Sequence, residues 1–108
     1  MSESSTSNIK SLTTENFESE IAGGGTFIVD FWAQWCGPCM QQLPILEQFA
    51  GNAPEGVTVA KVNIDDEKEI AAKLGIRSIP TMIVFRNGEE INRHTGLAGP
   101  AQLAKLVE

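Results

Sequence analysis

Two segments of this chain are apolar on both of their alternating faces, and they limit the fold more than any other feature. The segments are TFIVDFWA (26–33) and VTVAKVNI (57–64). Successive side chains of a strand point to opposite faces, so each segment predicts a strand that is covered on both sides. Such strands are typical of a sheet between two layers of helices. Charged or amide side chains interrupt the pattern at Asp30, Lys61 and Asn63.

The remaining segments predict helices and strands in alternation. Apolar residues recur at helical spacing after Thr13 and Asp66, which suit helix N-caps. The dipeptide Asn87-Gly88 between two strand-like segments is the strongest short signal for a β-hairpin. The expected order is a strand at 9–12, a helix at 13–23, the strand at 26–33, a helix at 37–51, the strand at 57–64, a helix at 66–75, strands at 81–85 and 90–95, and a helix from 100. This order predicts an α/β domain whose mixed sheet ends in an antiparallel hairpin.

Composition is consistent with one globular domain, which we expect over residues 9–108, after a disordered N-terminal tail at 1–8. Of 108 residues, 42% are hydrophobic and 20% are charged. The net charge of -6 disfavours binding to nucleic acid or to an anionic membrane. The first residues, MSESSTSN, lack the basic and apolar regions of an export signal, which predicts a cytoplasmic protein.

The motif WCGPC (35–39) contains both cysteines of the chain, Cys36 and Cys39. A pair at this spacing can be part of a metal site, a structural disulfide or a redox couple. Zinc needs four ligands, and the chain adds only one histidine, His94, so no metal is expected. A disulfide that closes so short a loop stabilises a fold weakly, and a reducing cytosol would not preserve it. A redox couple needs only the residues that are present.

The motif lies where a buried strand ends and a helix begins. Backbone N–H groups at a helix N-terminus have no partners, and the macrodipole is positive there, so both favour a thiolate at Cys36. The thiolate is the nucleophilic form of cysteine. Cys39, one turn further on, should be buried and protonated at rest. Gly37 permits a tight turn, and Pro38 is tolerated because a first-turn N–H lacks a helical partner.

Five blocks of sequence together resemble the thioredoxin family. They are VDFWAQWCGPC (29–39), PIL (44–46), AKVNID (60–65), GIRSIPT (75–81) and the F-x-NGE pattern (85–89) followed by Gly96. The resemblance covers about residues 9–107, and no block is displaced. It implies the thioredoxin fold: a central five-stranded mixed β-sheet flanked by four α-helices. The implied strand order across the sheet is first, third, second, fourth, fifth.

The resemblance also implies roles for individual residues. Cys36 is the attacking nucleophile and Cys39 the resolving cysteine of a redox-active disulfide. Asp30 is the buried acid behind the cysteines, and Lys61 is its charge partner. The residues that tune the redox couple are Gly37, Pro38 and Pro80, and those that bind substrate are Trp32, Trp35, Ile79, Pro80 and Gly96.

Three of these residues also allow plainer interpretations. Asp30 can be a hydrogen-bonded structural acid or, with a raised pKa, the base that deprotonates Cys39. Lys61 alone is an ordinary strand lysine. For Pro80 the residues alone favour a trans peptide bond, because cis occurs in only about 5–6% of X-Pro bonds. The resemblance implies cis.

The resulting functional hypothesis is a general protein-disulfide reductase that binds no cofactor. The chain lacks a G-x-G-x-x-G motif, so its electrons should come from NADPH through a separate thioredoxin reductase. Its other partners should be disulfide-containing proteins, and it should be a monomer. The rival hypotheses are a disulfide oxidase or isomerase and a binding module with dispensable thiols. Met40 stands where thioredoxins usually carry a basic residue, which leaves partner choice open.

Overall fold

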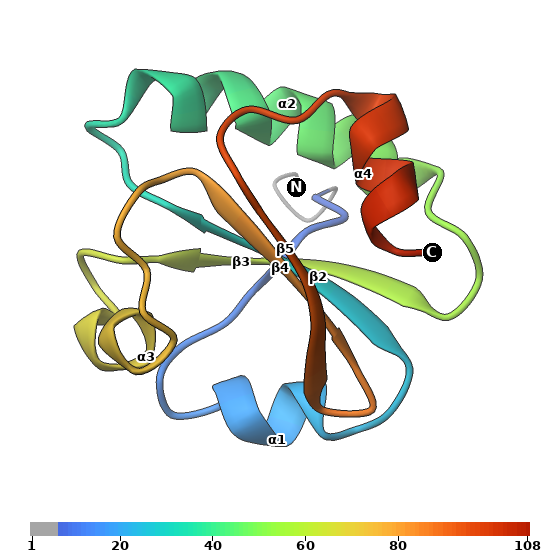
Figure 1. Cartoon of the computed structure of the whole chain (residues 1–108), viewed down its shortest axis with the longest axis horizontal. Helices are drawn as coiled ribbons and strands as arrows, with labels where there is room; N and C mark the ends of the chain where they lie inside the picture. The colour runs from blue at the N-terminus through green and yellow to red at the C-terminus, as the bar shows by residue number, and fades with distance from the viewer. Residues whose placement is uncertain (1–6) are drawn as a thin grey trace, which may run out of the picture.

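The computed structural model describes residues 7–108, and its elements follow the predicted alternation (Figure 1). In chain order they are β1 (Lys10–Ser11), α1 (Phe17–Ile21), β2 (Thr26–Trp32), α2 (Gly37–Gly51), β3 (Val57–Asn63), α3 (Lys68–Lys73), β4 (Thr81–Arg86), β5 (Glu89–Thr95) and α4 (Pro100–Leu106). The two-sided apolar segments are β2 and β3, as predicted.

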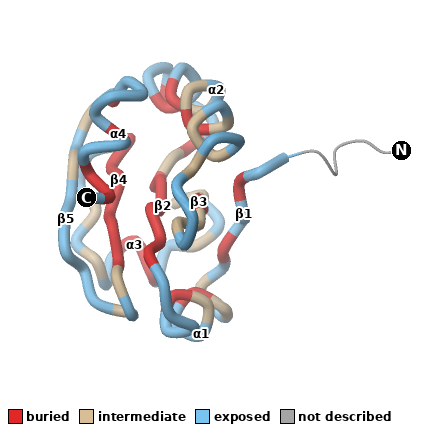
Figure 2. Tube along the Cα trace, turned by 90° about the vertical axis from the view of Figure 1, so that its right-hand side faces the viewer, coloured by how far each residue is buried: buried red, intermediate tan, exposed pale blue. Residues whose placement is uncertain are grey.

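The sheet has five strands in the order β1-β3-β2-β4-β5, which confirms the order implied by the family resemblance. The strand β3 runs parallel to both β1 and β2. The strand β4 runs antiparallel to both β2 and β5. Central β2 is buried along almost its whole length, whereas the edge strand β5 is exposed (Figure 2). The end of β2 is therefore held firmly by neighbours on both sides.

Helices cover both faces of the sheet, with α1 and α3 on one face and α2 and α4 on the other (Figure 1). On the first face, Val29 and Phe31 belong to a cluster with Phe17 of α1. On the second face, Ile28 shares a cluster with Leu46 of α2. Even-numbered residues of β2 therefore face the α2 layer. Within residues 7–108, no helix is long and apolar enough to cross a membrane.

The expected N-terminal tail falls mostly outside the described residues. Positions 1–6 are not described, so the tail and the limits of the domain stay predictions. Ser7 and Asn8 are described and contact α2. The Ser7 hydroxyl and the Asn8 backbone N–H donate to the Glu47 carboxylate at 3.0 and 2.6 Å. These bonds attach the start of the described chain to the helix that carries the cysteines.

The helices α1 and α3 both begin later than predicted, and Asp66 is not the N-cap of α3. Thr13 still caps the turn before α1, because its hydroxyl accepts the Asn16 backbone N–H at 3.3 Å and its own N–H donates to Asn16 Oδ1 at 2.8 Å. The helix α1 begins after Asn16 and not after Thr13, because the Thr13 carbonyl accepts the backbone N–H groups of Asn16 and Phe17 in a turn that precedes the helix. The helix α3 begins after Glu67, since an analogous turn satisfies the preceding N–H groups. The Glu67 carboxylate accepts a hydrogen bond from the Thr14 backbone at 2.8 Å instead of capping α3.

The hairpin between β4 and β5 forms at the predicted dipeptide. Asn87 and Gly88 both have positive φ, at 52° and 86°. Two successive left-handed residues suit the two-residue turns that match the twist of paired strands. The pairing of the strands is irregular between Val84 and Phe85. The turn thus defines the outer hairpin of the sheet.

Candidate active site

The two cysteines form a disulfide at the N-terminus of α2, with Cα atoms 5.2 Å apart. Cys36 occupies the N-cap position of this 15-residue helix, and the Cys39 backbone N–H donates to Cys36 Sγ at 3.2 Å. Cys36 is 6% exposed and Cys39 is 0% exposed. Cys36 therefore keeps a small exposed area whereas Cys39 has none, and the Cys36 sulfur lies at the partly positive N–H groups of the helix end.

Gly37 and Pro38 form the first turn of α2 between the cysteines. Pro38 sits where a missing N–H costs no helical hydrogen bond. Gly37 has no positive φ, and a Cβ added there would meet no heavy atom within 4 Å. Gly37 lies in the first turn as expected, but its backbone does not depend on the conformational freedom of glycine. Its influence on redox behaviour stays a prediction.

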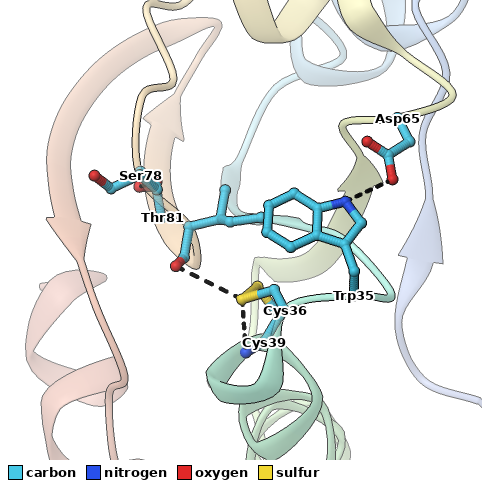
Figure 3. Close-up of a disulfide and its surroundings, with 7 residues drawn as sticks. Trp35, Cys36, Cys39, Asp65, Ser78 and Thr81 are labelled. Carbon is cyan, nitrogen blue, oxygen red and sulfur yellow. Dashed lines mark hydrogen bonds between the residues drawn. A yellow bond between two sulfur atoms is a disulfide. The ribbon is translucent and has the colours of Figure 1, made fainter.

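Two tryptophans lie near the disulfide in different surroundings. Trp35 is 69% exposed, and its Nε1–H donates to Asp65 Oδ2 at 2.9 Å. Figure 3 shows this indole beside the disulfide, with its nitrogen directed away from the sulfur atoms. Trp32 is half-buried and packs against the cluster of Ala33, Cys36 and Cys39. Trp35 thus supplies exposed aromatic surface, and Trp32 supplies an inner wall.

The segment directly before β4 lies against the disulfide. The Ile79-Pro80 peptide bond is cis, as the family resemblance implies. The Ile79 carbonyl oxygen lies 3.7 Å from Cys36 Sγ. The Gly96 backbone N–H donates to the Pro80 carbonyl at 2.8 Å, and Gly96 has a φ of +104° that favours glycine. The predicted docking residues Ile79, Pro80 and Gly96 therefore lie together, with Ile79 against Cys36.

Asp30 is a buried acid on the α2 side of the sheet. It lies between Ile28 and Trp32 on that face and is 0% exposed. Within the described part of the chain, neither of its carboxylate oxygens has a hydrogen-bond partner. Burial raises the pKa of Asp30 to about 7, and the positive charge of Lys61 opposes this rise. A carboxyl group with this pKa can exchange a proton near neutral pH.

Lys61 is the register partner of Asp30 on β3. Its Nζ lies 5.4 Å from the centroid of the Trp32 ring, a distance typical of a cation–π contact. Among residues 7–108, no ion pair within 4.0 Å joins Lys61 to Asp30. A surface pocket of about 330 Å³ borders both Trp32 and Lys61. The lysine therefore acts on Asp30 through longer-range charge, from a position that solvent can reach.

Two residues that support the site were not predicted from the sequence. Asp65, directly after the predicted strand, holds the Trp35 indole. Gln42 is fully buried on α2 and forms two hydrogen bonds with Ala98. Gln42 shares the buried helix face with Cys39 and Leu46, so an amide on an otherwise apolar face was the available signal. For Asp65 the sequence offered no comparable signal.

The arrangement supports thiol–disulfide exchange. One sulfur is accessible, its partner is buried one turn away, and an acid with a pKa near neutrality faces the same helix. Residues 7–108 contain no group of three or more His, Cys, Asp or Glu side chains that could hold a metal ion. Fold and site together define a thiol–disulfide oxidoreductase.

Comparisons with known proteins agree with this class. The family model described as Thioredoxin matches residues 8–108. The chain is 44% identical over 98 residues to thioredoxin of Alicyclobacillus acidocaldarius, covering 90% of this chain and 93% of the relative. Thioredoxin of Chlamydia pneumoniae is 43% identical over 99 residues, covering 92% and 95%. The crystal structure of Malassezia sympodialis thioredoxin aligns with a TM-score of 0.83 at 31% identity, covering 94% and 89%.

The chain belongs to the thioredoxin family. Its relatives and its cysteine pair identify it as a protein-disulfide reductase. This confirms the family, the fold class and the activity expected from the sequence. The roles of the individual residues are a separate question.

Proposed function

We propose that this chain is a general reductant of protein disulfides in which Cys36 is the nucleophile. The observation that carries this assignment is the difference in accessibility between Cys36 and fully buried Cys39. The Cys36 thiolate attacks one sulfur of the target, forms a mixed disulfide and releases the other target sulfur as a thiolate. The Cys39 N–H and the helix N-terminus stabilise the attacking charge.

Cys39 completes the reaction, with Asp30 assisting the proton transfer. The Cys39 thiol loses its proton, and its thiolate attacks Cys36 Sγ. This forms the Cys36–Cys39 disulfide and releases the second target sulfur, which becomes a thiol. Two electrons have then passed from the dithiol to the target. Two observations support the assignment of Asp30 as the proton acceptor: its pKa is about 7, and it lies on the sheet face covered by α2.

The residues around Cys36 form the proposed docking surface. Exposed Trp35 and half-buried Ile79 and Gly96 offer a partly apolar contact area beside Cys36, and buried Pro80 links Ile79 to Gly96 through its carbonyl. Backbone groups near Ile79 suit pairing with an extended target chain. We further propose that the protein works as a cytoplasmic monomer, binds no cofactor and is recharged with electrons from NADPH by a separate thioredoxin reductase.

Cysteine variants test these roles with insulin as the disulfide substrate and dithiothreitol as the reductant. Cys36→Ser should abolish turnover, because the accessible sulfur is lost. Cys39→Ser, first reduced and then freed of dithiothreitol, should still attack insulin but should accumulate the mixed disulfide, which mass spectrometry detects. A trapped adduct on Cys39 in the Cys36→Ser variant would contradict the assignment.

Two further measurements separate the rival functions and the proposed electron donor. Equilibration with a glutathione buffer should give a strongly reducing potential, and a strongly oxidising value would instead indicate an oxidase or isomerase. Turnover supported by NADPH and a thioredoxin reductase should match that with dithiothreitol. If a strain that carries only the Cys36→Ser, Cys39→Ser double variant keeps the cellular role, the chain acts as a binding module.

A further inference from the structure

The Gln42 side chain joins α2 to the loop that carries Gly96. Its Nε2 donates to the Ala98 carbonyl at 2.8 Å, and its Oε1 accepts the Ala98 backbone N–H at 2.7 Å. Gln42 is 0% exposed and Ala98 is 2% exposed. A buried amide satisfies both backbone groups of one residue here, so losing it would leave two buried groups unpaired. We call this pair of bonds the Gln42–Ala98 clasp.

The same loop has a second attachment on the other side of Leu97. The Gly96 N–H donates to the Pro80 carbonyl at 2.8 Å. Leu97 lies between the two attachments and is 48% exposed. The Gly96 attachment leads to the segment that contacts Cys36, and the Ala98 attachment leads to α2, whose N-cap is Cys36. The clasp therefore fixes the position of Gly96 and Leu97 relative to the disulfide.

We propose that Gln42 is a positioning residue that holds the Gly96–Leu97 backbone ready to receive an extended chain of a protein disulfide. The proposal rests on the docking surface proposed above and adds Leu97 to it. A loop that is already ordered loses less conformational entropy when a target binds. Gln42 acts through this loop and does not itself contact the target, so its effect should depend on the size of the target.

The test compares Gln42→Met with Gln41→Met. Methionine keeps the volume of Gln42 but removes both bonds, and Gln41 is an exposed neighbour of the same type. Both proteins reduce insulin and the small disulfide cystine, with dithiothreitol as the reductant. Gln42→Met should raise KM for insulin about fivefold with kcat within twofold, while cystine reduction also changes less than twofold. Gln41→Met should leave all three quantities within twofold.

Amide hydrogen exchange shows whether the loop is released locally. In Gln42→Met the Ala98 N–H should exchange at least about tenfold faster, because its acceptor is gone. The Leu103 N–H, which bonds Gly99 O within α4, should exchange as in the unaltered protein. If Gln42→Met fails to fold, Gln42→Asn serves instead, since its shorter amide keeps polarity but cannot reach both Ala98 groups. It should raise KM for insulin in the same direction.

The outcomes are distinguishable. An unchanged KM for insulin, with faster Ala98 exchange, would overturn the proposal and leave Gln42 a structural role only. Equal losses with insulin and cystine would also overturn it, because the defect would then lie at the cysteines. Failure of the unaltered protein to reduce insulin would instead refute the proposed function.

Discussion

Two fully buried polar side chains near the disulfide have opposite surroundings. Gln42 on α2 makes two hydrogen bonds with Ala98. Asp30 on β2 makes none with either carboxylate oxygen within the described residues. Both are 0% exposed. The paired amide orders a loop, whereas the unpaired acid has its pKa raised to about 7. A buried side chain with hydrogen-bond partners thus holds the backbone in place here. A buried acid without such partners has a pKa near neutral pH and can exchange a proton there.

The comparison is tested most strongly by Asp30→Asn. The pKa of Asp30 is about 7 in the folded protein, against 3.8 for an unperturbed aspartate. The folded state binds the extra proton between these values, so the free energy of unfolding should fall as pH rises from about 4 to about 7. The asparagine variant lacks this loss. It should be more stable than the unaltered protein by up to about 4 kcal/mol at pH 9 and similar at pH 3.

Urea denaturation of the disulfide form across this pH range measures the effect. Exposed Asp66 offers the control, because Asp66→Asn should change stability by less than about 0.5 kcal/mol throughout. A constant difference between Asp30→Asn and the unaltered protein across the range would show that the acid is satisfied after all. The same variant should release the mixed disulfide more slowly if Asp30 accepts the Cys39 proton.

Gln42→Met tests the paired side of the comparison. It leaves the Ala98 N–H and carbonyl unpaired in a buried site, which should lower the free energy of unfolding by about 2 kcal/mol. This loss should be the same at pH 5 and pH 9, because an amide does not titrate. Thermal and urea unfolding measure this loss, with Gln41→Met as the control variant. A gain in stability, or a loss that varies strongly with pH, would remove the contrast with Asp30.

Lys61→Met sharpens the electrostatic account of Asp30. The charge of Lys61 lowers the pKa of Asp30 against the larger effect of burial. Its removal should therefore raise that pKa further, and the pH midpoint of the stability change should move upward. Carbon NMR of the Asp30 carboxyl group follows the titration directly. A midpoint that moves downward would mean that Lys61 acts mainly through its contact with Trp32.

Met40→Lys should have the smallest effect, because Met40 is 42% exposed and its surroundings are screened by water and salt. A positive charge one residue after Cys39 should slightly increase the thiolate fraction of Cys36 and shift the preference among acidic and basic targets. Ultraviolet absorbance of the thiolate, measured against Met40→Gln, reports the first effect. A lower thiolate fraction in Met40→Lys would contradict the prediction.

Sequence periodicity predicted helices and strands well where burial determines the apolar pattern. The strands β2 and β3 and the helix α2 lie where two-sided apolar segments and the WCGPC motif indicated. The first residues of α1 and α3 were wrong because a separate turn precedes each helix, in which the backbone carbonyls and the side chains of Thr13 and Asn63 both accept N–H groups. Such turns depend on backbone geometry, which residue types do not specify.

The site was predictable in its parts but incomplete. The cysteines, Asp30 and Pro80 were found from the motif and the family resemblance. Gln42 was missed because its partner, Ala98, lies 56 positions away in the sequence and bonds through its backbone. The lack of a close ion pair between Asp30 and Lys61 could not be predicted from the sequence either. Adjacent register positions do not determine where the end of a long side chain lies.

The exposed edge strand β5 has a consequence for how this protein meets other chains. An open strand edge can recruit a second chain into a growing sheet. Here the edge carries Glu89, Glu90 and Arg93, and its pairing with β4 is interrupted between Val84 and Phe85. Charge and irregular pairing both oppose such growth. The exposed edge of β5 is thereby protected from pairing with the strands of other chains.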